Sequence, residues 1–142
     1  MSRTYRGILV PADPTQPIIE WTATVPVVET GRNPESLLRQ GICQAIHAEW
    51  LECVTSTHLH DLAPSRTHTV TMVVDEEGEM AHADKRINPR AWVFYPNARS
   101  AIYGDVILLG QRRDLEDGYT LESLPAHITA KTLAQKMLEI QP

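Results

Sequence analysis

Cysteine is scarce in this chain of 142 residues, which contains only Cys43 and Cys53. Two cysteines cannot form the disulfide framework of a small secreted domain, and their separation fits neither a zinc knuckle nor a redox pair. We therefore expect two free, buried thiols and a protein of the reducing cytoplasm.

Long apolar runs and an excess of positive charge are also missing. No stretch approaches the ~20 apolar residues that a membrane helix needs, and no charged-then-apolar leader opens the chain. Lys and Arg number 13 against 18 Asp and Glu, for a net charge of -5. A protein that reads duplex DNA usually carries a basic face, so we do not expect duplex DNA as a partner. Because no apolar run is long enough for a membrane helix, we do not expect a membrane partner either. The acids are interleaved with arginines, which argues against mimicry of DNA.

Common catalytic motifs are absent as well. The chain contains no Gly-X-Ser-X-Gly nucleophile elbow, no glycine-rich phosphate loop and no His-Glu-X-X-His sequence. These absences favour a non-catalytic protein that carries no cofactor.

What is present is the composition of a globular domain, with 42% hydrophobic and 22% charged residues. A chain of this length forms one domain that buries roughly two thirds of its surface. Alternating and β-branched stretches predict strands, which we place at residues 5–10, 17–25, 50–56, 67–74, 79–83 and 106–109. The first two are expected to form a hairpin.

Proline after asparagine marks two predicted helix starts. Asn33 and Pro34 begin a helix that extends to about residue 47, and Asn88 and Pro89 begin a short helix. Pro125 begins a C-terminal amphipathic helix. The element order predicts a single α+β domain over the whole chain, with a largely antiparallel sheet, two main helices and one short helix.

Three further local predictions concern turns and glycines. The polar, proline-containing residues 57–65 are expected to form a loop. Gly41 weakens its helix, and we expect it to let the sheet approach closely. Gly78 closes the acidic turn after residue 74, where we expect a positive φ.

Residues 69–110 contain three blocks in a characteristic order. An acidic turn, VVDEEG, occupies residues 73–78, and Asn-Pro-Arg-Ala occupies residues 88–91. Residues 102–110 then place Gly-Asp before an apolar strand. This order resembles the core of domain-of-unknown-function family 3846, small proteins of bacteriophages, plasmids and their hosts.

The chain also agrees with that family at its opening strand, residues 8–10, and at Ser-Leu-Pro, residues 123–125. It departs from the family in a longer middle, residues 55–67. The family brings no established activity and no catalytic residues. The resemblance therefore implies a setting, that of an accessory protein of a mobile element acting in the host cytoplasm.

Histidines gather in the predicted loop and just after it, at His58, His60 and His68. A His-X-His pair on an extended chain suits zinc or another divalent ion. Histidines in a polar loop are more often solvated than bound to metal, so we expect no metal here.

A second candidate site surrounds the short helix start, where Lys85, Arg86, Asn88 and Arg90 could bind a phosphate or nucleotide. The alternative interpretation is that these cations balance the acids of residues 75–79.

Three functions from different classes remain. Small size, missing catalytic motifs and the implied setting favour a non-catalytic accessory protein that binds a host protein. The alternative is a protein that binds or sequesters a small anionic ligand such as a nucleotide. The third is a metal-dependent hydrolase that uses the histidines.

We expect a chelator to leave the melting temperature unchanged, because histidines without further ligands contribute no folding energy. Thermal denaturation with and without EDTA measures this. A drop of many degrees that zinc reverses would contradict the expectation and identify His58, His60 and His68 as ligands.

Overall fold

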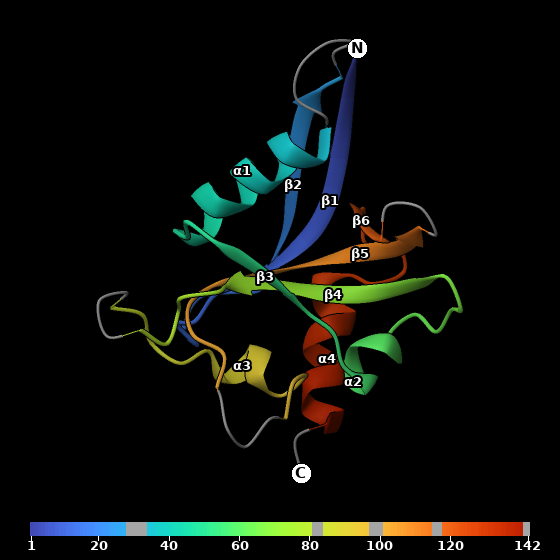
Figure 1. Cartoon of the computed structure of the whole chain (residues 1–142). Helices are drawn as coiled ribbons and strands as arrows, with labels where there is room; N and C mark the ends of the chain where they lie inside the picture. The colour runs from blue at the N-terminus through green and yellow to red at the C-terminus, as the bar shows by residue number, and fades with distance from the viewer. Residues whose placement is uncertain (28–33, 81–83, 97–100, 115–117, 141–142) are drawn as a thin grey trace.

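Six antiparallel strands and four helices make up the described part of the chain, residues 1–27, 34–80, 84–96, 101–114 and 118–140 of a computed structural model (Figure 1). The strands are β1 (Ser2–Val10), β2 (Ile19–Pro26), β3 (Leu51–Val54), β4 (His68–Asp75), β5 (Val106–Asp114) and β6 (Gly118–Glu122). The helices are α1 (Pro34–Ile46), α2 (Thr57–His60), α3 (Pro89–Trp92) and α4 (Ala130–Ile140). The strand order is β2-β1-β5-β4-β3, with β6 on β5. The predicted fold class, a single α+β domain with a largely antiparallel sheet, is confirmed.

β5 is the central strand of the sheet. Its first half pairs with β1, where Leu108 lies opposite Ile8, and its second half pairs with β6, where Gln111 lies opposite Leu121. Its other edge pairs with β4. Residues 106–109 are fully buried, which confirms the prediction that this apolar run is core.

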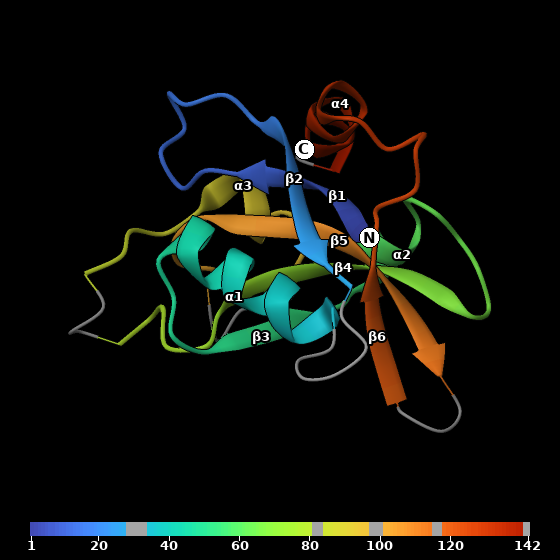
Figure 2. The same ribbon diagram turned by 90° about the horizontal axis from the view of Figure 1, so that it is seen from above.

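Each face of the sheet has its own hydrophobic core. α1 packs on one face, which we call the α1 face, and the other three helices pack on the opposite face (Figures 1 and 2). On the α1 face, Leu38, Ile42 and Ile46 meet Ile107 and Leu109. The opposite core combines the other helices with alternate residues of β4 and β5: Leu59, Ala91, Leu133, Met137, Val70, Met72, Val74, Val106 and Leu108. Among the helices of the described ranges, none has both the length and the apolar character needed to cross a membrane.

The prediction of a loop over residues 57–65 is wrong at its start, because α2 lies there. Ser56 caps this turn by accepting a hydrogen bond from the Leu59 N–H at 3.2 Å. Leu59 is fully buried in the core. A single apolar side chain among polar neighbours shows no helical period, so the burial that holds this turn was invisible in the sequence.

Two other boundaries differ from prediction. α4 begins at Ala130 rather than at Pro125, because Thr129 and Thr132 each accept a hydrogen bond from the other's backbone N–H and so cap the helix. Residues 79–80 lie in a turn and bend instead of a strand, and residues 81–83 lie outside the described residues, as does the predicted cap Asn33.

Both glycine predictions fail. A Cβ added to Gly41 would meet no atom within 4 Å, so no sheet approaches it. Gly78 lies in the predicted turn, but the glycines with positive φ in the described chain are Gly104 and Gly118. At Gly78 a Cβ would come within 3.1 Å of the Tyr103 side chain, so close packing accounts for the missing side chain.

We expect Ile107→Ala to lower the free energy of unfolding by ~2–5 kcal/mol, because it leaves a cavity between α1 and the sheet. The control Leu138→Ala alters a side chain that is 74% exposed and should change stability by less than about 0.5 kcal/mol. Urea denaturation of the two variants measures both values. Equal, small effects would contradict the assignment of β5 to the core.

Candidate functional site

Lys85, from the predicted anion site, is held by an acid and a carbonyl. Its Nζ lies 2.6 Å from a carboxylate oxygen of Asp75 and donates to the Ile46 carbonyl at 3.0 Å. The side chains of this pair are only 13% and 6% exposed. The pairing matches the alternative interpretation, in which the cations of this segment balance the acids of residues 75–79.

Arg90 and Arg86 both contact the turn that follows β1 and stabilise it. Arg90 Nη2 donates to the carbonyls of Pro11 and Asp13 at 2.7 and 3.0 Å, and burial lowers the pKa of Arg90. Arg86 lies 3.8 Å from the Asp13 carboxylate. Hydrogen bonds from Thr15 lower the pKa of Asp13, which therefore stays ionised beside these arginines.

Asn88 is fully buried and serves three backbone groups at once. Its Oδ1 accepts from the Ala91 N–H at 3.0 Å and caps α3, as predicted. Its Nδ2 donates to the Val10 and Gly104 carbonyls at 2.9 and 3.0 Å. The side chain thus joins β1, the start of α3 and the segment before β5.

The cleft beside these residues has a volume of about 440 Å³. Lys85 and Arg86 line it together with the three acids Asp13, Asp84 and Asp105. An anion there would meet those carboxylates and would compete with the bonds just described. The anion-binding prediction for Lys85, Arg86, Asn88 and Arg90 stays a prediction, and the structure gives these residues structural roles.

The three candidate histidines do not converge. His58 and His60 lie on α2, and His68 begins β4, with its Nε2 3.5 Å from Glu122. His60 Nδ1 lies 3.4 Å from Thr69 Oγ1. Within the described ranges, no three His, Cys, Asp or Glu side chains come close enough together to hold a metal ion.

Both cysteines are free, as predicted, but each is partly exposed instead of fully buried. Burial raises the pKa of both thiols. They are therefore protonated at neutral pH, and a protonated thiol is a poor nucleophile.

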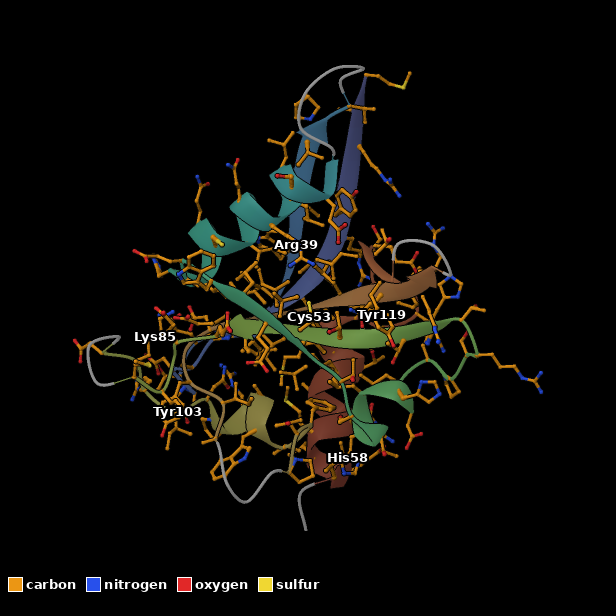
Figure 3. All side chains as sticks on the ribbon, in the orientation of Figure 1. Arg39, Cys53, His58, Lys85, Tyr103 and Tyr119 are labelled. Carbon is orange, nitrogen blue, oxygen red and sulfur yellow. The ribbon has the colours of Figure 1, made fainter. Side chains whose placement is uncertain are left out.

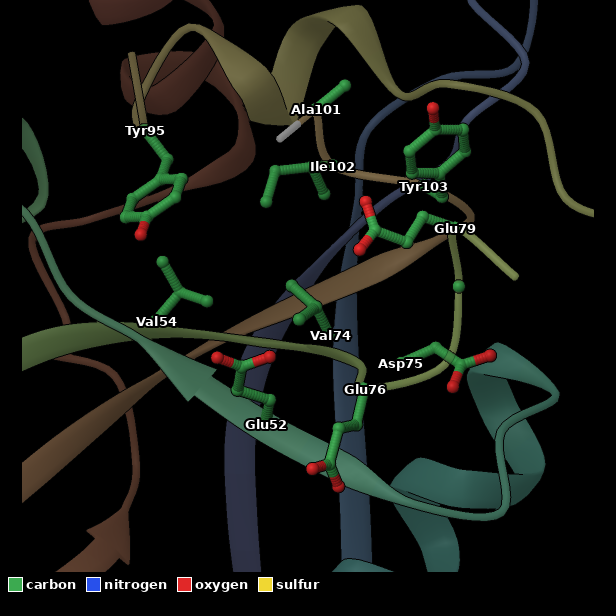
Figure 4. Close-up of a pocket in the computed structure, with 11 residues that line it drawn as sticks. Glu52, Val54, Val74, Asp75, Glu76, Glu79, Tyr95, Ala101, Ile102 and Tyr103 are labelled. Atoms are coloured by element: carbon green, nitrogen blue, oxygen red, sulfur yellow. The ribbon is translucent and has the colours of Figure 1, made fainter. Parts of the chain in front are cut away.

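A small acidic cavity of about 90 Å³ lies where β3 and β4 meet the segment before β5 (Figure 4). In Figure 4, Glu52 and Glu76 lie on one side of the cavity, Tyr95 lies on the other side, and Glu79 lies beside Tyr103. This acidic lining disfavours an anionic ligand.

The largest polar depression that we describe lies on the α1 face, beyond the part of the sheet that α1 covers. Its volume is about 620 Å³, and a contiguous hollow adds about 190 Å³. We call the two together the sheet groove. Its lining comes from β3, α2, β4, β5 and β6: Cys53, Thr55, Ser56, Thr57, His60, Ser65, Arg66, Thr67, His68, Thr69, Gln111, Arg113 and Tyr119. Cys53 of β3 and Tyr119 of β6, both part of this lining, are labelled in Figure 3.

Strand register explains why these side chains share one face. Gln111 lies opposite Thr69 of β4 and Leu121 of β6, and Leu121 packs into the core of the α1 face. Since side chains alternate along a strand, Arg113 projects from the same face as Gln111. Tyr119 lies directly opposite Arg113 and therefore stands beside it.

Gln111 is the unusual residue of the groove. It is only 8% exposed, yet its side-chain amide has no hydrogen-bond partner among the described residues. The amide opens onto the groove, because Gln111 lines both of its hollows. The buried side-chain nitrogen or oxygen without a hydrogen-bond partner among the described residues is Arg90 Nε, so the Gln111 amide is not a buried unsatisfied group and carries no desolvation cost of that kind.

The outer end of the groove carries positive charge. Neither Arg66 nor Arg113 forms an ion pair with any residue that the structure describes. Both line the smaller hollow with Tyr119, which is 59% exposed. Two guanidiniums that have no carboxylate partner in the described ranges, beside an accessible ring, favour an anionic ligand.

Sequence reasoning missed this groove because it missed β6. The sequence signal for β6 is the alternation of Tyr119 and Leu121 after Gly118. This alternating stretch is too short to predict a strand. Comparison of the chain with models of known families, with curated proteins and with solved structures finds no match.

We expect Asn88→Ala to destabilise the protein by about 2–4 kcal/mol, because it removes a helix cap and leaves two buried carbonyls without donors. Asn88→Asp keeps the cap acceptor but loses both donations, so it should also destabilise. Gln135→Ala, in an exposed position of α4, is the control for losing an amide. Thermal denaturation compares the three, and a stable Asn88→Ala would contradict the structural role.

Proposed function

We propose that this protein is a non-catalytic binding protein that takes a small anionic ligand in the sheet groove. The observation that carries the proposal is the Gln111 side chain, which lines both hollows of the groove and whose amide forms no hydrogen bond with the described chain. A ligand would supply the hydrogen bonds that the protein does not. The volume of about 620 Å³ suits such a ligand.

Charge supports an anion over a neutral or cationic ligand. Arg66 and Arg113 have no carboxylate partner among the described residues. Nucleophilic catalysis gains no support, because burial raises the pKa of the Cys53 thiol in the groove.

The resemblance to the family of mobile-element proteins supplies a setting for such binding. An accessory protein that sequesters a small anionic signal or metabolite of the host needs a site and no catalytic machinery.

Binding of a host protein is the second candidate function. The observation that favours it is Trp50, which is 60% exposed and immediately precedes β3. β3 ends the strand order and pairs only with β4 within the described sheet. Edge strands and exposed tryptophans are both used in protein recognition. A host protein retained by the wild type and lost on Trp50→Ser would support this function, and equal retention would contradict it.

We expect pyrophosphate or ribose 5-phosphate to raise the melting temperature, and Arg113→Ala to abolish most of that rise. Saturation at a hundredfold excess over Kd corresponds to about 2.7 kcal/mol of added stability. Arg112→Ala is the matched control, because it removes the same charge from the next residue, whose side chain projects from the opposite face. Thermal shift assays of the three proteins measure this, and equal losses in both variants would contradict a site in the groove.

A further inference from the structure

We infer that the ligand of the sheet groove is a mononucleotide, with the edge of its base on Gln111 and its phosphate on Arg113 and Arg66. This inference rests on the proposed function and specifies the class of ligand. Three features of the groove lead to it.

The first is the amide of Gln111. It offers one acceptor oxygen and a donor NH₂ group side by side in one plane. A planar partner with an adjacent donor and acceptor satisfies both groups together, and nucleobase edges present this pattern. A sugar phosphate or a simple carboxylate does not. Gln111 lines both hollows of the groove and its amide forms no hydrogen bond with the described chain, so the amide is available to such a partner.

The second feature is the cross-strand pair of Tyr119 and Arg113. Directly opposed residues have Cβ atoms about 5 Å apart, so the exposed ring and the guanidinium lie side by side. The tyrosine ring offers a surface on which a base can stack. Such stacking accepts any of the bases, and it adds little to the affinity of a phosphate that carries no base. The guanidinium offers a bidentate site for a phosphate.

The third feature is the spacing along β5. Gln111 and Arg113 are two positions apart on one face, which corresponds to about 7 Å along the strand. A ligand that meets both must carry its anionic group a short distance from a planar ring. Between and beside them, Thr55, Thr57 and Thr69 line the groove with hydroxyls that can bind a sugar.

A nucleic acid strand fits less well than a mononucleotide. The groove has only two cations without described ion-pair partners, Arg66 and Arg113, whereas a bound strand needs a basic track along its backbone. The net charge of -5 also opposes a polyanion.

The test is calorimetric titration of the wild-type protein with AMP, GMP, CMP, UMP, adenosine and ribose 5-phosphate. We expect at least one nucleoside monophosphate to bind about tenfold or more tightly than ribose 5-phosphate, since only the nucleotide pairs with the Gln111 amide. Gln111→Leu should remove that preference and leave ribose 5-phosphate binding unchanged. Arg113→Ala should weaken nucleotide and sugar phosphate alike, and Arg112→Ala should weaken neither.

Two controls keep the result interpretable. Gln111→Leu should retain or raise the melting temperature, because the amide it removes has no hydrogen bond to the described protein. Tyr119→Ala changes an exposed side chain and should weaken nucleotides several-fold more than ribose 5-phosphate, by loss of stacking.

Contrary results would distinguish failure of the nucleotide inference from failure of anion binding in the groove. Equal affinity for ribose 5-phosphate and every nucleotide, or nucleotide binding that Gln111→Leu leaves intact, would overturn the nucleotide inference and leave anion binding in the groove standing. Absence of binding by every phosphate-bearing probe would overturn both. Binding that tracks Arg112 instead of Arg113 would also overturn both.

Discussion

The pairing of β5 with three neighbours is the constraint on which the rest of the structure depends. Its first half is apolar and lies between β1 and β4, and its second half is polar and lies between β6 and β4. A slip of one residue would turn Ile107 and Leu109 away from α1 and would turn Gln111 and Arg113 away from the groove. One register therefore determines both the core and the candidate site.

Polar side chains with several donors have two uses in this protein. Asn88 Nδ2 and Arg90 Nη2 donate to backbone carbonyls of Val10, Pro11 and Gly104, and so hold together chain segments that are distant in sequence. Gln111 and Arg113 have no such partners in the described structure. An amide and a guanidinium thus stabilise the fold in one place and face an open groove in the other. Only their contacts distinguish the two roles.

The groove also illustrates the relation between stability and binding. Leucine at position 111 would bury well against the neighbouring core residue Leu121, whereas glutamine leaves an amide without a protein partner. A polar side chain at a position that leucine could fill is typical of a functional site, where a ligand contacts it.

The sequence by itself determined the elements whose signals are local. The apolar run of residues 106–109, the alternation in β4 and the Asn-Pro starts of α1 and α3 depend on near neighbours, so the α+β class and the antiparallel sheet could be predicted from them. Tertiary structure alone decided the rest. α2 is held by the burial of Leu59, β6 by its pairing with β5, and the groove by a register that joins four strands. These contacts link residues far apart in the chain, and a pattern that repeats every two or four residues carries no information about such distances.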